Sequence, residues 1–396
     1  LAFFLFACGT RAEHQRTETA ASIVRINTDS LKKAAERNAF YASRVQQFTD
    51  SLLGRGHFNG SVLVAKDGQI LFEKYYGYAN PRFRNDSISE HSATHLASVS
   101  KTLTAAAILK LWQDGKLDIH DAVSKYLPQF PLPDVTIKTL LNHRSGLPNY
   151  VHFMDQLGWN KNKFVHNQDV LQFLVDHRKQ IAIGPADRHF SYSNTNYALL
   201  ALIIEKVSGL PYPRFMQQEI FEPLGMKDTY VFTEADSARS IGSYFYSGRP
   251  YRFDFLDYVY GDKNIYSTVR DLFAFDQALE KGSFLRKEIQ DSAYAPYSFE
   301  KPGIHNYGLG WRMYDQKNGK KLIYHNGWWH GNRTAFVRMQ DEDAVIIALC
   351  NNDYKQVYKI NKLASLFGDY WPGSGTPSMR DDDPEDNETT QAAPRQ

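Results

Sequence analysis

The stretch Ser98-Val99-Ser100-Lys101 opens the apolar run Leu103–Trp112, and the rest of the chain is organised around it. The run predicts a buried helix, and Gly115 predicts where that helix ends. Ser98 and Lys101 are three residues apart, so they lie on the same face of a helix. Backbone N–H groups in a first helical turn have no partner within the helix. The stretch therefore offers a nucleophile, a base and one oxyanion donor, which is the combination that covalent acyl transfer needs.

The same spacing occurs twice more, at Ser30 with Lys33 and at Ser298 with Lys301. Ser30 heads a charged amphipathic segment, and Ser298 runs into a Pro-Gly turn. Only Ser98 opens a run apolar enough to be buried, and a lysine must lose its solvation to become a neutral base near pH 7. The spacing alone leaves open that Ser98 is a helix N-cap followed by a surface lysine.

Length and composition narrow the class of protein. The chain has 396 residues, of which 42% are hydrophobic, so we expect one or two folded domains with a large core. A net charge of +2, without Lys/Arg-rich runs, argues against a nucleic-acid partner. No stretch reaches the roughly 20 apolar residues that span a bilayer.

The two ends of the chain differ from its middle. Residues 1–8 are apolar and resemble the end of a secretory signal, in which Leu5-Phe6-Ala7-Cys8 resembles a bacterial lipoprotein cleavage box. This resemblance implies lipid attachment at Cys8 and export to the periplasm or outer membrane, with membrane association through the anchor; the alternative is an ordinary signal-peptide remnant. Residues 9–30 predict a polar tether, and residues 371–396 predict a disordered acidic tail. Cys350 ends an apolar run, so we expect it to be a small core residue that forms no disulfide.

The segments between predict an α+β fold. We expect helices at 31–53, 137–141, 168–178, 195–207, 266–281 and 354–368, and strands at 60–66, 69–75, 251–255, 307–313, 321–325, 334–339 and 344–349, with 210–232 irregular. If the first and last strands join in one antiparallel sheet flanked by helices, residues 31–370 form one domain. An all-α lobe is then inserted within roughly residues 95–260, and a cleft between the lobes is a usual place for a site.

Two later stretches can complete a serine site. The Tyr192 phenol can move protons between Ser98, Lys101 and a leaving group, and the Asn194 amide can bind a substrate carbonyl and Lys101. In His325-Asn326-Gly327-Trp328, Gly327 lets a substrate approach the strand, and the Trp328 N–H is the second oxyanion donor beside Ser98.

These three motifs, in this order, resemble the serine β-lactamase-like hydrolases of the class C group, with its D,D-peptidases and esterases. Supporting matches are Leu140–Pro148, Tyr192–Leu200, Tyr266–Leu272 and Tyr307–Trp311. The resemblance covers roughly residues 40–368. It implies a β-lactamase/transpeptidase-like fold, Ser98 as nucleophile, Lys101 with Tyr192 as the acid/base pair, and N–H groups of Ser98 and Trp328 as the oxyanion hole. It also implies substrate contacts from Asn194, His325 and Gly327, and ester or amide substrates that include β-lactams and D-amino-acid peptides.

One residue departs from the pattern of the β-lactamases. His325 stands where those enzymes and the D,D-peptidases mostly carry lysine, and histidine is common in the esterase-like members. An ordinary histidine is largely neutral at pH 8, so we expect weak β-lactamase activity and an affinity for carboxylate substrates that rises on acidification. Arg333 supplies the missing charge if its side chain turns inward.

Other functions were weighed against this one. A sensor or structural protein of the same fold, which binds acyl groups or penicillin without hydrolysis, is the alternative. The 13 histidines show no paired metal motif, so no metal or cofactor is expected. We expect His143 to cap a turn, and we expect His330 to be either a pocket residue or a turn residue. Aromatic side chains at 244–260 predict either a pocket wall or packing between strands. We expect a monomer that acts on a small molecule or peptide.

Overall fold

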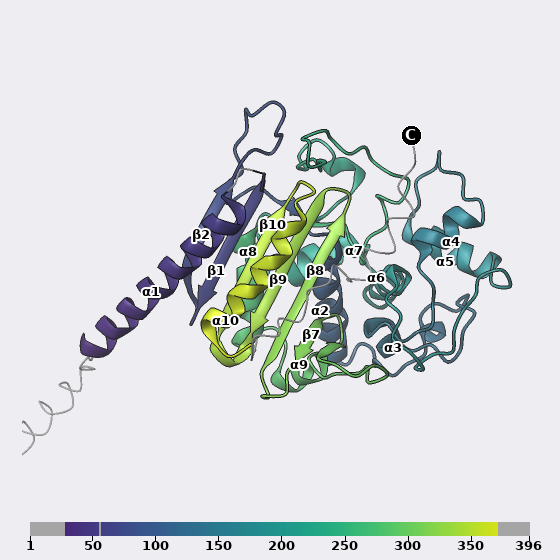
Figure 1. Ribbon diagram of the computed structural model, residues 1–396. Helices are drawn as coiled ribbons and strands as arrows, with labels where there is room; N and C mark the ends of the chain where they lie inside the picture. Colours follow the sequence, from purple (N-terminus) through teal and green to yellow (C-terminus); the bar gives the residue numbers. More distant parts are fainter. Residues whose placement is uncertain (1–27, 55–56, 371–396) are drawn as a thin grey trace, which may run out of the picture.

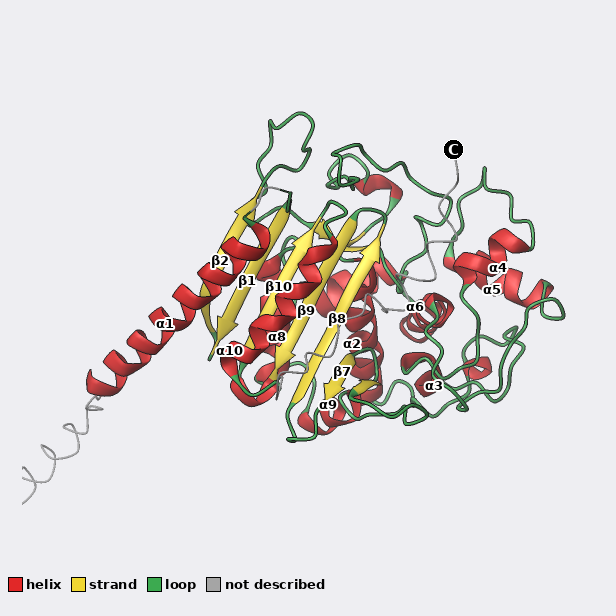
Figure 2. Ribbon diagram, viewed as in Figure 1, coloured by secondary structure: helices red, strands yellow, loops and turns green. Residues whose placement is uncertain are grey.

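The computed structural model describes residues 28–54 and 57–370, and at its centre lies a seven-stranded antiparallel sheet (Figures 1 and 2). Across the sheet the strand order is β2-β1-β10-β9-β8-β7-β6. The strands are β1 (Gly60–Lys66), β2 (Gln69–Tyr76), β6 (His305–Tyr307), β7 (Arg312–Asp315), β8 (Lys321–Trp329), β9 (Asn332–Met339) and β10 (Ala344–Cys350). Val62 of β1 pairs with Ala348 of β10, so the first hairpin joins the last strands, and the prediction of one antiparallel sheet is confirmed.

Side chains on alternate residues of the strands divide the core into two layers. Val62 and Val64 contribute to the layer beneath α1 (Thr28–Leu53), whereas Leu63 contributes to the layer on the opposite face. This division follows from the pleat, since successive side chains of a strand point to opposite faces. The first face is covered by α1 and α10 (Ala364–Phe367), and the second by α2 (Ser100–Gln113), α8 (Val269–Glu280) and α9 (Lys287–Ala293) (Figure 1).

A helical region lies beside the sheet, with α2 between the two (Figure 1). Its helices are α3 (Ile137–Leu141), α4 (Tyr150–Gln156), α5 (Asn167–Asp176), α6 (Asn194–Ser208) and α7 (Tyr212–Phe215). Every residue of α2 from Ser100 to Leu109 is buried, because this helix has a neighbour on each side. A small second sheet, β3 (Thr94–His95), β5 (Ile265–Ser267) and β4 (Tyr230–Val231), lies at the start of α2.

Several predicted elements were wrong in the loop-rich parts. Residues 210–232 are not irregular, since α7, the π-helix Met216–Phe221 and β4 lie there. Residues 251–255 form no strand; instead Tyr251 stacks on Phe245 at 3.6 Å between ring centroids, and Phe253 is 55% exposed. The aromatic alternation there reflects ring packing within a loop.

Three further boundaries differ from the prediction. The expected strand 307–313 is split into β6 and β7 by a turn, in which the Gly308 N–H donates to Trp311 O at 2.8 Å and Gly310 has a φ of +89°. The expected helix 354–368 is a 3-10 helix, Lys355–Leu363, followed by α10. Helix α1 begins at Thr28, so residues 28–30, which we expected in the tether, are helical.

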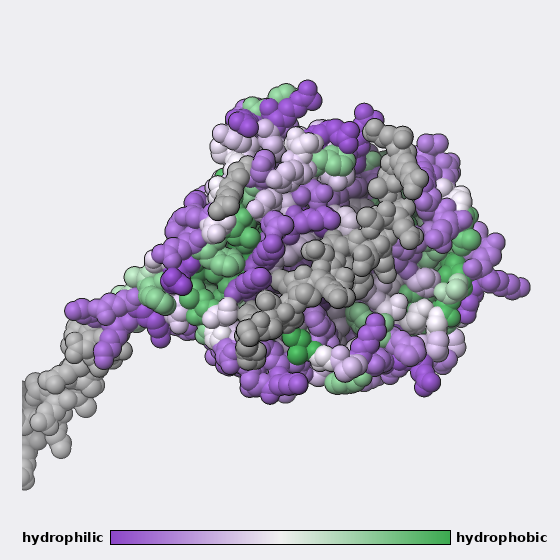
Figure 3. Space-filling view, viewed as in Figure 1, coloured by the Kyte–Doolittle hydropathy of each residue, from purple (hydrophilic) through white to green (hydrophobic). Residues whose placement is uncertain are grey.

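The predictions for residues 1–8, including Cys8, for residues 9–27 and for 371–396 lie outside the described residues. Within residues 28–54 and 57–370, no helix has the length and apolar character needed to cross a membrane. The face of the molecule in Figure 3 is mostly hydrophilic, with hydrophobic residues gathered beside α1 and near α4 and α5.

Candidate active site

The structure brings Ser98 and Lys101 together at the start of α2. A single 3-10 turn, Ala97–Val99, leads into the helix, so the two side chains lie on one face as expected. Lys101 Nζ donates to Ser98 Oγ at 3.0 Å and to Asp262 O at 2.9 Å. Lys101 is fully buried and Ser98 is 5% exposed. Of the three Ser-x-x-Lys sequences, this is the one whose lysine is buried, since Lys33 and Lys301 are exposed.

Tyr192 lies on the other side of Lys101, just before α6. Lys101 Nζ is 4.9 Å from the centroid of the Tyr192 ring, and Tyr192 is 6% exposed. His143, which follows α3, stacks on the same ring at 4.3 Å and accepts the Ser193 N–H on Nδ1 at 3.1 Å. His143 therefore does more than cap a turn: its ring and its hydrogen bond fix the position of Tyr192.

Strand β8 forms the wall of the site next to Ser98. A Cβ built on Gly327 would lie 2.5 Å from Leu96 O and 2.9 Å from Ser98 N, so only glycine fits at this position. The Thr334 hydroxyl, on the neighbouring strand, donates to Leu96 O at 2.7 Å. Gly327 was predicted to admit a substrate; in the structure its close contact is with the backbone that carries Ser98.

The free edge of β8 presents the Trp328 backbone. The Gln316 N–H donates to Lys320 O, and the pairing of β7 with β8 extends from there to Arg312, which lies opposite Tyr324. In an antiparallel strand every second residue directs its backbone N–H and C=O to the same neighbouring strand. Trp328 is an even number of residues after Lys320, so its N–H points to the β7 side of β8, past the pair of Arg312 with Tyr324. The strand geometry therefore directs the Trp328 N–H to the free edge of β8.

His325 is fully buried and both ring nitrogens are occupied. Nδ1 lies 2.6 Å from Asn326 O and must donate, so Nε2 accepts from the Tyr307 hydroxyl at 3.1 Å. Burial lowers the pKa of His325 well below its ordinary value, and the nearby cations Arg312 and Lys101 lower it further. These surroundings favour the neutral ring, which opposes the gain of charge on mild acidification that we expected of His325.

Two arginines differ in where their charge lies. Arg333 does not turn inward: it bonds to Asp353 through Nε at 2.9 Å and lies over the Trp328 ring at 4.1 Å, on the face away from Ser98. Arg312 was missed by the sequence analysis, yet its guanidinium lies 4.9 Å from the Tyr192 ring centroid. Arg312 is the first residue of the short strand β7 and belongs to no sequence motif, so no sequence pattern indicated its place in the site.

Asn194 is the first residue of α6 and borders the same site. Its Oδ1 is buried, and within the described residues it accepts no hydrogen bond, so the expected contact with Lys101 through this oxygen is not formed. Lys101 is instead held by the Asp262 carbonyl, a contact that sequence reasoning missed.

The aromatic stretch at 244–260 lines a pocket at the end of β8 that carries Trp329. The pocket walls include Tyr251, Phe253 and His330. His330 is also the first residue of the β8–β9 turn, with a φ of 53°, and its Nε2 lies 3.0 Å from both carboxylate oxygens of Asp257. Both alternatives for His330, pocket residue and turn residue, are therefore correct.

Comparison with known proteins identifies the family and supports the fold described above. A family model described as Beta-lactamase matches residues 43–366. Penicillin-binding protein 4* of Bacillus subtilis (strain 168) is 35% identical over 340 residues, which cover 80% of this chain and 74% of that protein. The octameric penicillin-binding protein homologue from Pyrococcus abyssi aligns with a TM-score of 0.70 at 26% identity, covering 82% of this chain and 77% of that one. D-amino acid amidase from Ochrobactrum anthropi SV3, at 23% identity and a TM-score of 0.67 over 82% of this chain and 98% of that one, shares the fold.

The fold and the paired Ser98 and Lys101 define a serine hydrolase with an α+β, β-lactamase/transpeptidase-like architecture. The chain belongs to the Beta-lactamase family.

The buried histidines of this site make stability depend on pH. Next to Ser98, His95 donates from Nε2 to Asn264 Oδ1 at 2.9 Å and accepts the Ala97 N–H on Nδ1, and burial lowers its pKa from 6.5 to about 4. The unfolded chain binds this proton below about pH 6.5 and the folded chain only below about pH 4. We therefore expect His95 to remove about 3 kcal/mol from the free energy of unfolding as pH falls from 6.5 to 4.

Chemical denaturation of the wild type and His95→Gln across this range measures the effect. The variant is expected to lose about 3 kcal/mol less than the wild type on acidification, because glutamine does not titrate. Equal losses in the two proteins would show that His95 does not contribute.

Proposed function

We propose that this chain hydrolyses amides or esters through an acyl-enzyme on Ser98, and that its preferred substrates carry a carboxylate. The observation that carries the proposal is the 3.0 Å hydrogen bond from a fully buried lysine, Lys101, to Ser98 Oγ. A lysine held out of water beside a hydroxyl is suited to accept its proton.

In the proposed reaction, Ser98 Oγ bonds to the substrate carbonyl carbon while its proton passes to Lys101. The negative charge on the carbonyl oxygen is held by the backbone N–H groups of Ser98 and Trp328. Tyr192 relays the proton to the leaving nitrogen or oxygen, and the bond from that atom to the carbonyl carbon breaks. Water then attacks the acyl carbon, its proton returns through the same groups to Ser98 Oγ, and the acid is released.

Substrate position is fixed by the groups around Ser98. The free edge of β8 beside Gly327 and Trp328 offers backbone groups to an extended substrate. Asn194 Oδ1, which accepts no bond from the described residues, is suited to an amide N–H of the substrate. His325 acts through Tyr307, whose hydroxyl it binds, rather than as a cation.

Arg312 supports the preference for a carboxylate. Its guanidinium lies over the Tyr192 ring, as Lys101 does, and its charge adds to the burial that lowers the pKa of His325 and His143. An arginine keeps its charge across the working range of pH and binds carboxylates in a fork geometry. Penicillin, which the name of the Bacillus subtilis relative says that protein binds, also carries a carboxylate. We therefore include β-lactams and D-amino-acid peptides among the ligands to test.

We further propose that the protein is exported and anchored through Cys8, and that it acts as a monomer. The support for the anchor is the sequence Leu5-Phe6-Ala7-Cys8.

The acyl-enzyme is tested with fluorescent penicillin and an activated ester. Wild type is expected to gain the mass of one acyl group, whereas Ser98→Ala is expected to gain none and to lose kcat/KM by several orders of magnitude. Ser298→Ala, the same change at a serine that is not paired with a buried lysine, is the control and should behave as wild type. Labelling that survives Ser98→Ala would contradict the assignment, and an adduct that never turns over would favour the acyl-binding alternative.

Arg312 is tested with a matched pair of amides, one with a free carboxylate and one with the carboxylate amidated. Arg312→Gln is expected to lower kcat/KM for the charged amide about 10- to 100-fold and to leave the neutral one unchanged, because a charge-assisted hydrogen bond contributes about 1.5–3 kcal/mol. The wild-type preference should stay constant from pH 6 to 9. Arg270→Gln, which removes an arginine paired with Glu73, is the control. Equal losses for both amides would rule out this role.

The anchor is tested by fractionating cells that make the full precursor. We expect the wild type in the membrane fraction and Cys8→Ser in the soluble fraction, since the lipid chains require the thiol. The same distribution for both forms would argue for a signal peptide without lipid.

A further inference from the structure

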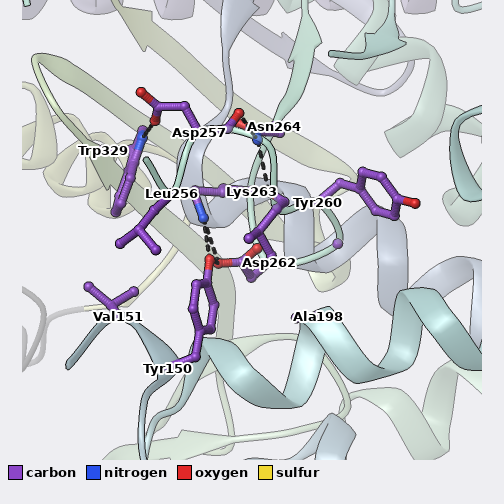
Figure 4. A network of polar contacts seen from close by, with 12 residues as sticks. Tyr150, Val151, Ala198, Leu256, Asp257, Tyr260, Asp262, Lys263, Asn264 and Trp329 are labelled. Carbon is purple, nitrogen blue, oxygen red and sulfur yellow. Dashed lines mark hydrogen bonds and ion pairs between the residues drawn. The ribbon is translucent and has the colours of Figure 1, made fainter. Parts of the chain in front are cut away.

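A buried ion pair, Asp262 with Lys263, lies in a network of polar contacts with Tyr150 (Figure 4). Asp262 Oδ2 is 3.2 Å from Lys263 Nζ and accepts the Tyr150 hydroxyl at 3.0 Å. The two side chains are 1% and 3% exposed. The carbonyl of the same Asp262 accepts the hydrogen bond from Lys101 Nζ at 2.9 Å, so the pair is anchored to the residue that holds the catalytic lysine.

The surroundings of Lys263 hold its charge in place. Its Nζ donates to the Tyr150 hydroxyl and lies 4.5 Å from the Trp329 ring centroid, and Figure 4 shows these side chains converging on it. Asp262 Oδ1 has no hydrogen-bond partner among the described residues, so Lys263 and Tyr150 supply the contacts that this carboxylate has. Removing two charges from water costs several kcal/mol per ion, and apolar residues would fill this space at less cost. A role in the site would account for the pair.

The charged and titratable groups that face Lys101 come from every element around it. Ser98 lies on its own helix, and the ring of Tyr197 on α6 is 5.7 Å from its Nζ. Tyr192 precedes α6 and Arg312 lies on β7. The further groups are His325 on β8 and His143 after α3, both held neutral by burial. The Asp262 carboxylate belongs to the residue whose backbone carbonyl binds Lys101 Nζ, and Lys263 is its counter-ion.

We propose that Lys263 is a positioning residue whose charge balances the Asp262 carboxylate, so that Lys101 can release its proton and serve as the base for Ser98. Without the Lys263 ammonium, the carboxylate would be an unbalanced negative charge on the residue whose backbone carbonyl binds Lys101 Nζ. An opposite charge within about 4–6 Å favours the charged form of a group. Lys101 would then stay protonated to higher pH and could not accept the Ser98 proton.

The inference rests on the Ser98 and Lys101 roles proposed above, and its test needs no natural substrate. A fluorophosphonate probe reacts when Ser98 Oγ bonds to phosphorus and fluoride leaves, with the serine proton passing to the base. Its labelling rate between pH 6 and 10 therefore follows the protonation of the base. For Lys263→Met we expect the midpoint of the pH profile to rise by about one pH unit. Labelling should then be about tenfold slower at pH 7 and should recover to the wild-type rate at high pH.

Three further variants separate charge from structure. The double variant Asp262→Asn with Lys263→Met is expected to return the midpoint to the wild-type value, because both charges are gone. Lys263→Arg, which keeps the charge, should leave the midpoint unchanged. Lys66→Met removes a partly buried lysine next to an aspartate, at the end of β1, and serves as the matched control.

The outcomes distinguish this inference from the proposed function. Slower labelling of Lys263→Met by one factor at every pH, with an unmoved midpoint, would show a structural role and overturn the proposal. If Lys263→Met does not fold by circular dichroism, Lys263→Gln is used instead, since it keeps hydrogen bonding without charge, and the same rise is expected. Absence of labelling in the wild type itself would contradict the role of Ser98.

Discussion

The close contact between Gly327 and the backbone at Leu96 and Ser98 is the constraint on which the rest of the site depends. A side-chain atom at position 327 would overlap Leu96 O, so the start of α2 can lie against β8 only because this residue is glycine. The Thr334 hydroxyl closes the same contact by donating to Leu96 O. With the helix and the strand held together in this way, Ser98 lies next to the free edge of β8, where the Trp328 N–H points. A helical protein or a sheet alone could not provide both groups.

The second constraint is the burial of a lysine. Lys101 is removed from water by α6 and by the loop before it, and its Nζ is held between Ser98 Oγ and the Asp262 carbonyl. Such a group is tolerated only where its neighbours satisfy its hydrogen bonds and balance its charge. The histidines, the aromatic rings and the Asp262 carbonyl surround Lys101, and Arg312 lies over the same Tyr192 ring as Lys101.

The sequence predicted the parts that depend on local pattern. The pairing of Ser98 with Lys101 follows from helical spacing, and the first hairpin follows from Asp67-Gly68 between apolar runs. The neutral state expected of His325 at pH 8 agrees with its burial, but the extent of that burial comes from Tyr307, Asn326 and the surrounding core, which no local pattern shows. Arg312 and Asp262 were missed for a related reason: they reach the site from segments that carry no motif. Ring packing in a loop imitated a strand at 251–255.

Helix α2 and strand β8 together are expected to build one acylation site, and the structure of the protein acylated by a slowly hydrolysed substrate tests this. We expect the acyl group on Ser98 Oγ, with its carbonyl oxygen within hydrogen-bond distance, about 2.7–3.1 Å, of the backbone nitrogens of both Ser98 and Trp328. An acyl group on another residue, or a carbonyl oxygen directed away from Trp328, would contradict the account.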